Sequence, residues 1–73
     1  MKFDMKESGR RIFDLRSDLG MTQAELAGKV GVASNTIVQY EKGISKMSVE
    51  VLFGLALALR TNADYILCLT DTP

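Results

Sequence analysis

Apolar residues recur along the chain at helical spacing. Ile12, Leu15 and Leu19 follow one another at three- and four-residue steps, which predicts a helix over 6–19 with these side chains facing inward. Gly20 follows as a stop signal for that helix. No segment alternates polar and apolar residues as an edge strand does, and the only proline is the last residue. The pattern therefore favours helices along the whole chain.

Caps and stop signals predict four further helices. Thr22, with Glu25 three residues later, forms a capping box for a helix over 23–30. The third helix, over 34–41, has Gly43 as its terminator, and Ser48 caps a fourth helix that reaches residue 59. Asn62 precedes a short fifth helix over 63–67. We expect residues 1–73 to form a single compact all-α domain of five helices, in which residues 1–5 are a flexible N-terminal arm.

The link between the second and third helices is too short for an antiparallel pair. The two helices must cross steeply, which requires a small residue at their contact and a turn residue with positive φ. Ala27 and Gly31 meet these needs. Five apolar side chains are expected to fill the wedge between the helices: Leu26, Val30, Val32, Ile37 and Tyr40. This combination predicts a helix-turn-helix whose second helix presents its outer face to solvent.

The outer face of this helix carries few charges. It comprises Ser34, Asn35, Val38, Gln39 and Lys42. Asparagine and glutamine donate to and accept from the N6 and N7 edge of adenine, serine is adaptable, and valine suits a thymine methyl group. These residues are predicted to contact DNA bases, with the exception of Lys42. The alternative is an ordinary solvated helix face, but the tight turn before the helix favours base reading.

The segments "RIFDLRSDLGMTQAELAGKVGVASNTIVQYEKG", "SVEVLFGLALAL" and "ADYILCLTD" resemble the Cro/repressor-type helix-turn-helix domains of the XRE family. The resemblance implies a lambda-repressor-like fold and base contacts by Ser34, Asn35 and Gln39. It also implies contacts to DNA phosphates by the following residues: Gln23, helped by Thr22, together with Lys42, Lys46 and Arg10. The other basic residues, Arg11 among them, are expected to be solvated charges.

The resemblance further implies an ion pair between Arg16 and Glu41, which we expect to be largely buried. Two positions depart from the family pattern. Ala33 stands where the family has a capping serine or threonine, so either Ser34 caps the helix or the helix loses about 1 kcal/mol at its start. Arg60 replaces a common glycine, so the turn after the fourth helix is either strained or built differently.

Two apolar rows are predicted on the fourth helix. The inward row comprises Val49, Leu52, Leu55, Ala56 and Leu59. Val51, Gly54 and Leu57 form a separate outward row at steps of three. Scattered exposed apolar residues are normal, but a glycine between valine and leucine permits close helix approach. We expect the outward row to form a two-fold dimer interface.

Composition narrows the functional classes. Nine basic and nine acidic residues give a net charge of zero, which argues against unspecific coating of polyanions. The chain lacks histidine and has one cysteine, Cys68, so no internal disulfide, metal-ligand cluster or catalytic constellation is expected. We therefore predict a protein that is not an enzyme and needs no cofactor. The N-terminal residues lack a signal-peptide pattern and no apolar run is long enough for a bilayer, so a cytoplasmic location is expected.

These features predict a DNA-binding transcriptional regulator. In its simplest form it is a repressor that binds a near-palindromic operator in double-stranded DNA as a homodimer. The alternative is a protein-interaction adaptor, or an antitoxin-like protein with a protein partner, on the same fold. Net neutrality favours the adaptor, whereas Asn35 and Gln39 together with Gln23 favour DNA more strongly.

Overall fold

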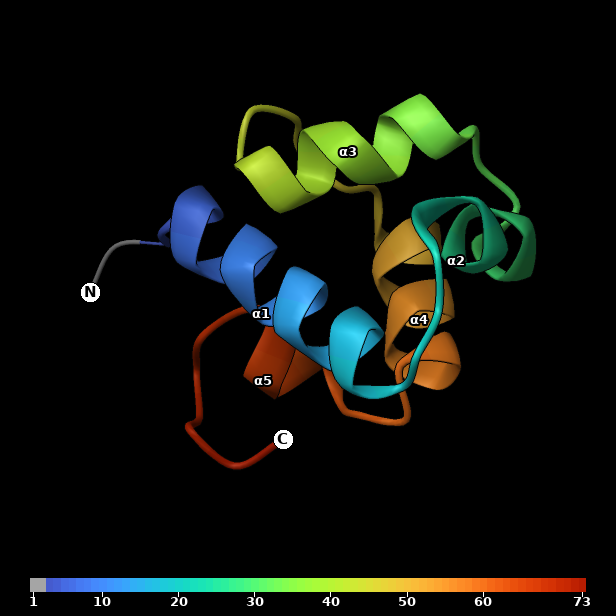
Figure 1. Cartoon of the computed structure of the whole chain (residues 1–73). Coiled ribbons are helices and arrows are strands. Elements are labelled where there is room, and N and C mark those ends of the chain that lie inside the picture. The colour runs from blue at the N-terminus through green and yellow to red at the C-terminus, as the bar shows by residue number, and fades with distance from the viewer. Residues whose placement is uncertain (1–2) are drawn as a thin grey trace.

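A computed structural model describes residues 3–73 of the chain, and within them it contains five helices and no strand. The helices are α1 (Met5–Asp18), α2 (Gln23–Val30), α3 (Ser34–Lys42), α4 (Val49–Ala58) and α5 (Ala63–Ile66). They pack as a small bundle in which α3 lies along one side and the C-terminal segment along the other (Figure 1). The predicted all-α, five-helix architecture is confirmed.

The helix boundaries lie close to those predicted, with one correction at the N-terminus. The side chain of Asp4 accepts hydrogen bonds from the backbone N–H groups of Lys6 and Glu7, so it caps α1. Met5 is therefore the first residue of a helix, and the predicted arm over 1–5 is wrong for residues 4 and 5. Residues 1 and 2 of that arm lie outside the described residues.

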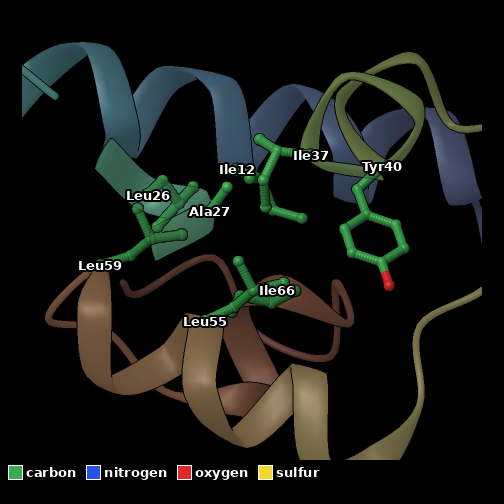
Figure 2. Packing of buried hydrophobic residues seen from close by; sticks show 8 residues of the cluster. All are labelled: Ile12, Leu26, Ala27, Ile37, Tyr40, Leu55, Leu59 and Ile66. Carbon is green, nitrogen blue, oxygen red and sulfur yellow. The ribbon is translucent and has the colours of Figure 1, made fainter. Parts of the chain in front are cut away.

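Eight apolar residues form the buried core between the helices: Ile12, Leu26, Ala27, Ile37, Tyr40, Leu55, Leu59 and Ile66 (Figure 2). All five helices contribute to this cluster, which is why so small a chain closes around one core. Two residues predicted to face inward do not do so. Leu19 lies at the exposed end of α1, and Val49, the first residue of α4, is 78% exposed.

α1 and α3 approach each other closely enough to exclude side chains at two positions. A β-carbon on Gly9 would lie 2.3 Å from the backbone oxygen of Tyr40 and 2.6 Å from that of Glu41. Gly43, just after α3, has φ +71°, and a β-carbon there would lie 2.7 Å from the Cα of Lys6. The absence of side chains at these two positions thus sets how α3 lies on α1.

The turn after α4 shows how the chain accommodates Arg60 in place of a glycine. The backbone N–H of Thr61 bonds to the Ala56 oxygen and that of Arg60 to the Leu57 oxygen, which is the pattern that normally ends on a left-handed glycine. Arg60 adopts this conformation with φ 56°, as Cys68 does after α5 with φ 64°. The turn thus has the hydrogen bonds of a helix end that favours glycine, and the arginine is strained.

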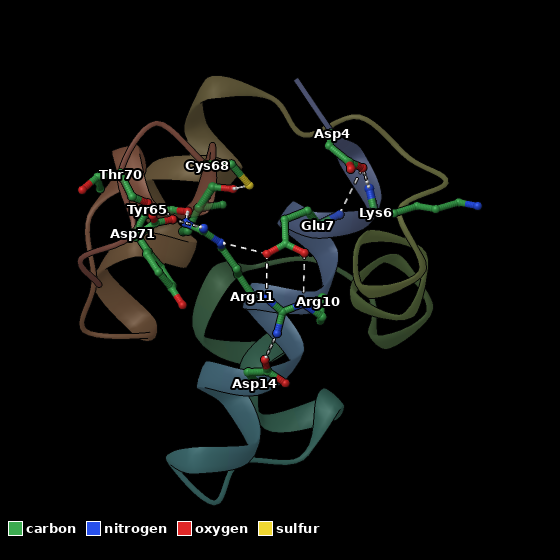
Figure 3. A network of polar contacts seen from close by, with 11 residues as sticks. Asp4, Lys6, Glu7, Arg10, Arg11, Asp14, Tyr65, Cys68, Thr70 and Asp71 are labelled. Carbon is green, nitrogen blue, oxygen red and sulfur yellow. Dashed lines mark hydrogen bonds and ion pairs between the residues drawn. The ribbon is translucent and has the colours of Figure 1, made fainter. Parts of the chain in front are cut away.

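Arg11 fixes the C-terminal segment to α1 (Figure 3). Its guanidinium donates to the backbone oxygens of Tyr65 at 2.8 Å and Thr70 at 2.6 Å, and to Asp71 at 2.9 Å. The guanidinium carbon also lies 4.3 Å from the centre of the Tyr65 ring. Arg11 is buried, so its interpretation as a solvated charge is wrong. It joins α1 to residues more than fifty positions later in the chain.

Candidate nucleic-acid interface

The turn between α2 and α3 has the geometry that the sequence predicts. Gly31 adopts φ +86°, and the backbone N–H groups of Gly31 and Val32 both bond to the oxygen of Ala27. Ala27 is almost fully buried between the helices, where a larger side chain would push them apart. The turn holds α3 along one side of the bundle, with its N-terminal end near α2 (Figure 1).

The beginning of α3 is exposed and has no side-chain cap. Ala33 is the N-cap residue and makes no side-chain hydrogen bond to the helix, so Ser34 does not take over the capping role. Ser34 is instead the first residue of the helix, and both it and Asn35 are exposed. Neither side chain has a hydrogen-bond partner within residues 3–73, so both retain their donors and acceptors for another molecule.

One turn further along α3, Val38 and Gln39 are half-buried at the surface. The Oε1 atom of Gln39 accepts a hydrogen bond of 2.6 Å from the hydroxyl of Ser45, in the loop before α4. Gln39 therefore lies at the surface in a fixed orientation, whereas Asn35 has no such restraint. Ser45 was not among the residues predicted from the sequence to belong to the site.

A groove of about 340 Å³ runs beside α3, where α1 and the start of α2 approach it. Its lining comprises Arg10, Phe13, Gln23, Val38, Glu41 and Lys42. Four of these residues were predicted to contact DNA, and three separate helices bring them together. Phe13 is half-exposed here, and the Arg16 guanidinium lies 5.2 Å from the centre of its ring.

An ion pair beneath the groove connects the three helices. Arg16 Nε donates to Glu41 at 2.6 Å and Nη2 donates at 3.1 Å, and the two side chains are 11% and 5% exposed. The Glu41 carboxylate raises the pKa of Arg16. Gln23 Nε2 also donates to Glu41, at 3.0 Å. Because the paired carboxylate accepts from α1 and α2 at once, it holds α3 in place against both helices.

The residues predicted to contact phosphates differ in whether their donors are free or already bonded within the chain. Thr22 accepts a hydrogen bond from the backbone N–H of Glu25 and caps α2, which leaves its hydroxyl proton free to donate. Lys42 and Lys46 are exposed and make no ion pair within residues 3–73. Arg10, in contrast, is held by Glu7 and Asp14 on its own helix at 2.6 Å each (Figure 3). Two carboxylates thus already neutralise Arg10.

The predicted outward row of α4 requires correction. A β-carbon on Gly54 would lie 3.3 Å from the side chain of Val30, so Gly54 faces α2 rather than solvent. Val51 packs against the core, and only Leu57 of the three is exposed. The exposed row is instead Val49, Phe53 and Leu57, which are 78%, 66% and 65% exposed. We call these three residues the α4 apolar row.

Phe53 was not predicted to lie on the exposed face of α4, although its spacing indicates that position. Val49, Phe53 and Leu57 stand at steps of four, the spacing of a single helix face. The pattern was hidden because α4 is apolar on nearly every side, so that steps of three and steps of four both yield apolar rows.

Within residues 3–73 the side chains form no group of acidic, cysteine or histidine residues able to hold a metal ion.

None of the helices in the described part of the chain is long and apolar enough to cross a membrane.

Comparison with known proteins relates the chain to helix-turn-helix regulators. A helix-turn-helix family model matches residues 12–66. An uncharacterized HTH-type transcriptional regulator from Rickettsia conorii is 37% identical over 57 residues, which are 78% of this chain and 46% of that protein. The chain thus spans about half the length of this relative.

Two solved structures are similar to the chain. The P22 c2 repressor in complex with a synthetic operator has a TM-score of 0.81 at 37% identity, covering 82% of this chain and 91% of that one. The regulator of biofilm formation SinR in complex with DNA has a TM-score of 0.77 at 28% identity, covering 82% and 97%. The fold, the turn and the family match agree: the chain belongs to the helix-turn-helix family of transcriptional regulators, as a DNA-binding domain of the Cro/repressor (XRE) type, and not to a family of enzymes.

Proposed function

We propose that this protein is a cytoplasmic, sequence-specific regulator that represses transcription by binding a near-palindromic operator as a homodimer. The observation that carries the proposal is the surface of α3. Ser34 and Asn35 are exposed at its start, and Gln39 follows on the same side one turn later. Uncharged side chains that both donate and accept hydrogen bonds suit the base edges of the major groove, where each base pair presents a distinct pattern.

The groove between α3 and α1 supports the placement of a DNA backbone beside that helix. Lys42 and Gln23 line it, and the first backbone N–H groups of α2 lie next to Gln23. A helix N-terminus favours a phosphate through its dipole and its unpaired N–H groups. Gln23 reaches such a phosphate with its backbone N–H and the second N–H of Nε2, because the first is bonded to Glu41. Arg10 has a smaller share in this contact, because Glu7 and Asp14 bind it.

The relatives point the same way. The P22 c2 repressor was solved with a synthetic operator, and SinR was solved with DNA. Both resemble this chain over more than four fifths of its length. In domains of this architecture the second helix of the motif enters the major groove, and two copies bind half-sites about one helical turn apart.

The α4 apolar row supports the dimer. Its residues stand symmetrically about Phe53, four positions on either side. If two α4 helices cross antiparallel at Phe53, Val49 meets Leu57 of the partner subunit and Leu57 meets Val49 of the partner subunit. Such reciprocal pairing is what a two-fold interface requires. A chain of 73 residues, with eight apolar residues buried within residues 3–73, also gains from covering this row.

Sedimentation tests the dimer. Phe53→Glu places a charge at the centre of the row without entering the core, so we expect a folded monomer. Phe13→Glu is the matched control, because Phe13 is also a half-exposed phenylalanine but lies on α1. It should leave the dimer intact. A Phe53→Glu variant that still sediments as a dimer would show that the interface lies elsewhere.

Selection from a random duplex library tests sequence recognition. The protein should enrich a two-fold symmetric site, with an affinity that falls steeply as salt rises. Gln39→Ala should cost about 1–3 kcal/mol at one base position, whereas Lys42→Ala should weaken binding to all sequences alike. If no sequence is enriched at moderate salt, the proposal is wrong.

A second candidate is a protein-binding role on the same fold, as an adaptor or an antitoxin-like protein. The α4 apolar row is the observation that favours it, because a partner protein could cover the row in place of a second copy. The Phe53→Glu variant separates the two roles. Loss of DNA binding together with dimerisation supports the regulator, whereas unchanged DNA binding by the monomer supports a partner at this surface.

A further inference from the structure

The hydrogen bond between Ser45 and Gln39 bears on which base Gln39 reads. We propose that Ser45 is a specificity-determining residue, which turns Gln39 into a donor-only reader that prefers guanine. The proposal rests on the proposed function, since it concerns the chemistry of the same DNA-binding surface. It differs from the expectation from sequence, in which Gln39 pairs with adenine through both amide atoms.

The loop that carries Ser45 is firmly placed. The backbone N–H of Ile44 bonds to the oxygen of Gln39 at 3.1 Å, and that of Gly43 bonds to the oxygen of Tyr40 at 3.0 Å. Together with the positive φ of Gly43, these bonds complete the reversal that ends α3 and returns the chain past Gln39. Ser45 follows directly after this reversal. Its hydroxyl therefore meets the side chain of Gln39 as a consequence of the backbone.

The short bond orients the glutamine amide. Ser45 donates to Oε1 at 2.6 Å, so the oxygen side of the amide is turned toward the loop. Nε2 lies on the opposite side of the amide, and it has no partner within residues 3–73. Solvent reaches Nε2, because it is not one of the buried side-chain atoms without a hydrogen-bond partner. The atom that Gln39 offers to an approaching duplex is thus a nitrogen with two N–H donors.

Base edges differ in how they suit such a donor. Adenine requires one acceptor and one donor from the protein, because it presents N7 and the N6 amino group. Guanine presents two acceptors side by side, N7 and O6, and both suit N–H donors. Because Oε1 is turned toward Ser45, it does not face the N6 amino group and the adenine contact is incomplete, while the two N–H donors of Nε2 still suit guanine. Removing the hydroxyl of Ser45 releases Oε1 and restores the adenine contact.

Site selection with matched variants tests this inference. Gln39→Ala first identifies the base position that Gln39 reads. At that position the natural protein should prefer guanine, and Ser45→Ala should shift the guanine-to-adenine ratio toward adenine by about tenfold. Ser45→Thr keeps the hydroxyl and should keep the guanine preference. Ser17→Ala removes an exposed hydroxyl from α1 and should change no position.

The outcomes separate this inference from the proposed function. An enriched site at which Ser45→Ala leaves the Gln39 position unchanged, or at which the natural protein already prefers adenine, would overturn the role of Ser45 while keeping DNA recognition. Failure to enrich any site would overturn the proposed function and, with it, the base preference. NMR of the free protein measures the link itself. The side-chain amide signals of Gln39 should shift and sharpen in Ser45→Ala but not in Ser17→Ala, and unchanged signals would refute the orientation.

Discussion

Arg60 and Cys68 are the two residues other than glycine with positive φ in the described chain. A side chain in the left-handed conformation costs about 1–2 kcal/mol, because its β-carbon approaches the following carbonyl oxygen. Both residues end a helix in a hydrogen-bonded turn that glycine adopts without strain. Both turns thus form although neither has the glycine that this conformation favours.

Replacing Arg60 by glycine should therefore stabilise the protein. The relief of strain exceeds the added entropy of the unfolded chain, for a net gain of about 1 kcal/mol. Thermal unfolding should show a Tm higher by roughly 4–8 °C. Arg60→Ala is the control, because it removes the guanidinium but keeps the β-carbon, and it should bring no gain. Equal gains from both variants would mean that the charge, and not the backbone, is the cause.

Ala33 offers a second stabilising change. A serine at this N-cap position places an oxygen within reach of the backbone N–H groups of Asn35 and Thr36, which no side chain caps in the natural protein. Ala33→Ser should raise the free energy of unfolding by about 1 kcal/mol in chemical denaturation. The same exchange at Ala24, inside α2, should bring no gain. If the two variants behave alike, the cap is not the reason.

Single residues mark where prediction from sequence succeeds and where it stops. That Ala33 cannot cap α3 was predicted from its side chain, whereas the sequence left open whether Ser34 would cap the helix instead. The contacts of Arg11 and Ser45 were not predicted. Arg11 bonds to residues in the C-terminal segment, and Ser45 meets Gln39 only because the chain reverses at Gly43. Contacts that depend on tertiary arrangement leave no periodic signal in the sequence.

At the scale of elements, the seating of α3 on α1 decides where the interface lies. The two helices are separated by so little that the position of Gly9 faces the backbone oxygens of Tyr40 and Glu41 directly. Gly28, in α2, has no atom within 4 Å of the place where its β-carbon would be. Close packing thus requires a glycine at position 9, whereas no neighbouring atom in the described chain requires one at position 28.

Gly9→Ala should destabilise the protein strongly, by about 3 kcal/mol, because backbone atoms have to move to admit the methyl group. Any folded fraction should also bind DNA less well, since α3 is displaced. Gly28→Ala should instead stabilise by about 0.5–1 kcal/mol, since alanine is the better helix former. Chemical denaturation of both variants measures this contrast. Similar effects of the two substitutions would contradict the close contact of α1 with α3.

The existence of all five helices was predictable from caps, stop signals and periodicity, but the rotation of α4 was not. Thr22, Ser48 and Asn62 cap their helices as local chemistry requires. α4, however, has apolar residues on several faces, so its sequence does not reveal which row faces the core. Packing decides this, because Gly54 admits Val30 of α2 and thereby turns Phe53 to solvent.

At the scale of the whole molecule, the net charge is zero, but some charged side chains are paired and others are not. Arg10 is paired with Glu7 and Asp14 along α1, and Arg16 is paired with Glu41. Lys42 and Lys46 are left unpaired within residues 3–73, at the end of α3 and in the loop after it. A chain of zero net charge can therefore have a basic edge beside α3.

The same pairing predicts how stability depends on pH. The Arg10 guanidinium lowers the pKa of Glu7, and the backbone N–H of Thr22 lowers the pKa of Glu25. A carboxyl whose pKa is lower in the folded state contributes its stability above its unfolded pKa, about 4.3, and loses it as pH falls through the folded value. Burial raises the pKa of Cys68, so the thiol stays protonated at neutral pH, and the chain has no histidine.

Thermal unfolding should therefore give a nearly constant Tm from about pH 6 to 8, and a Tm that falls below about pH 4.5. Glu25→Gln keeps the hydrogen bond to the Thr22 backbone through its amide oxygen but cannot titrate. This variant should lose part of the acid-dependent fall, whereas Glu50→Gln, at an exposed carboxyl that accepts no hydrogen bond within residues 3–73, should retain it. If the Tm falls equally in both variants as the pH decreases, the capping box of α2 does not contribute to the loss of stability in acid.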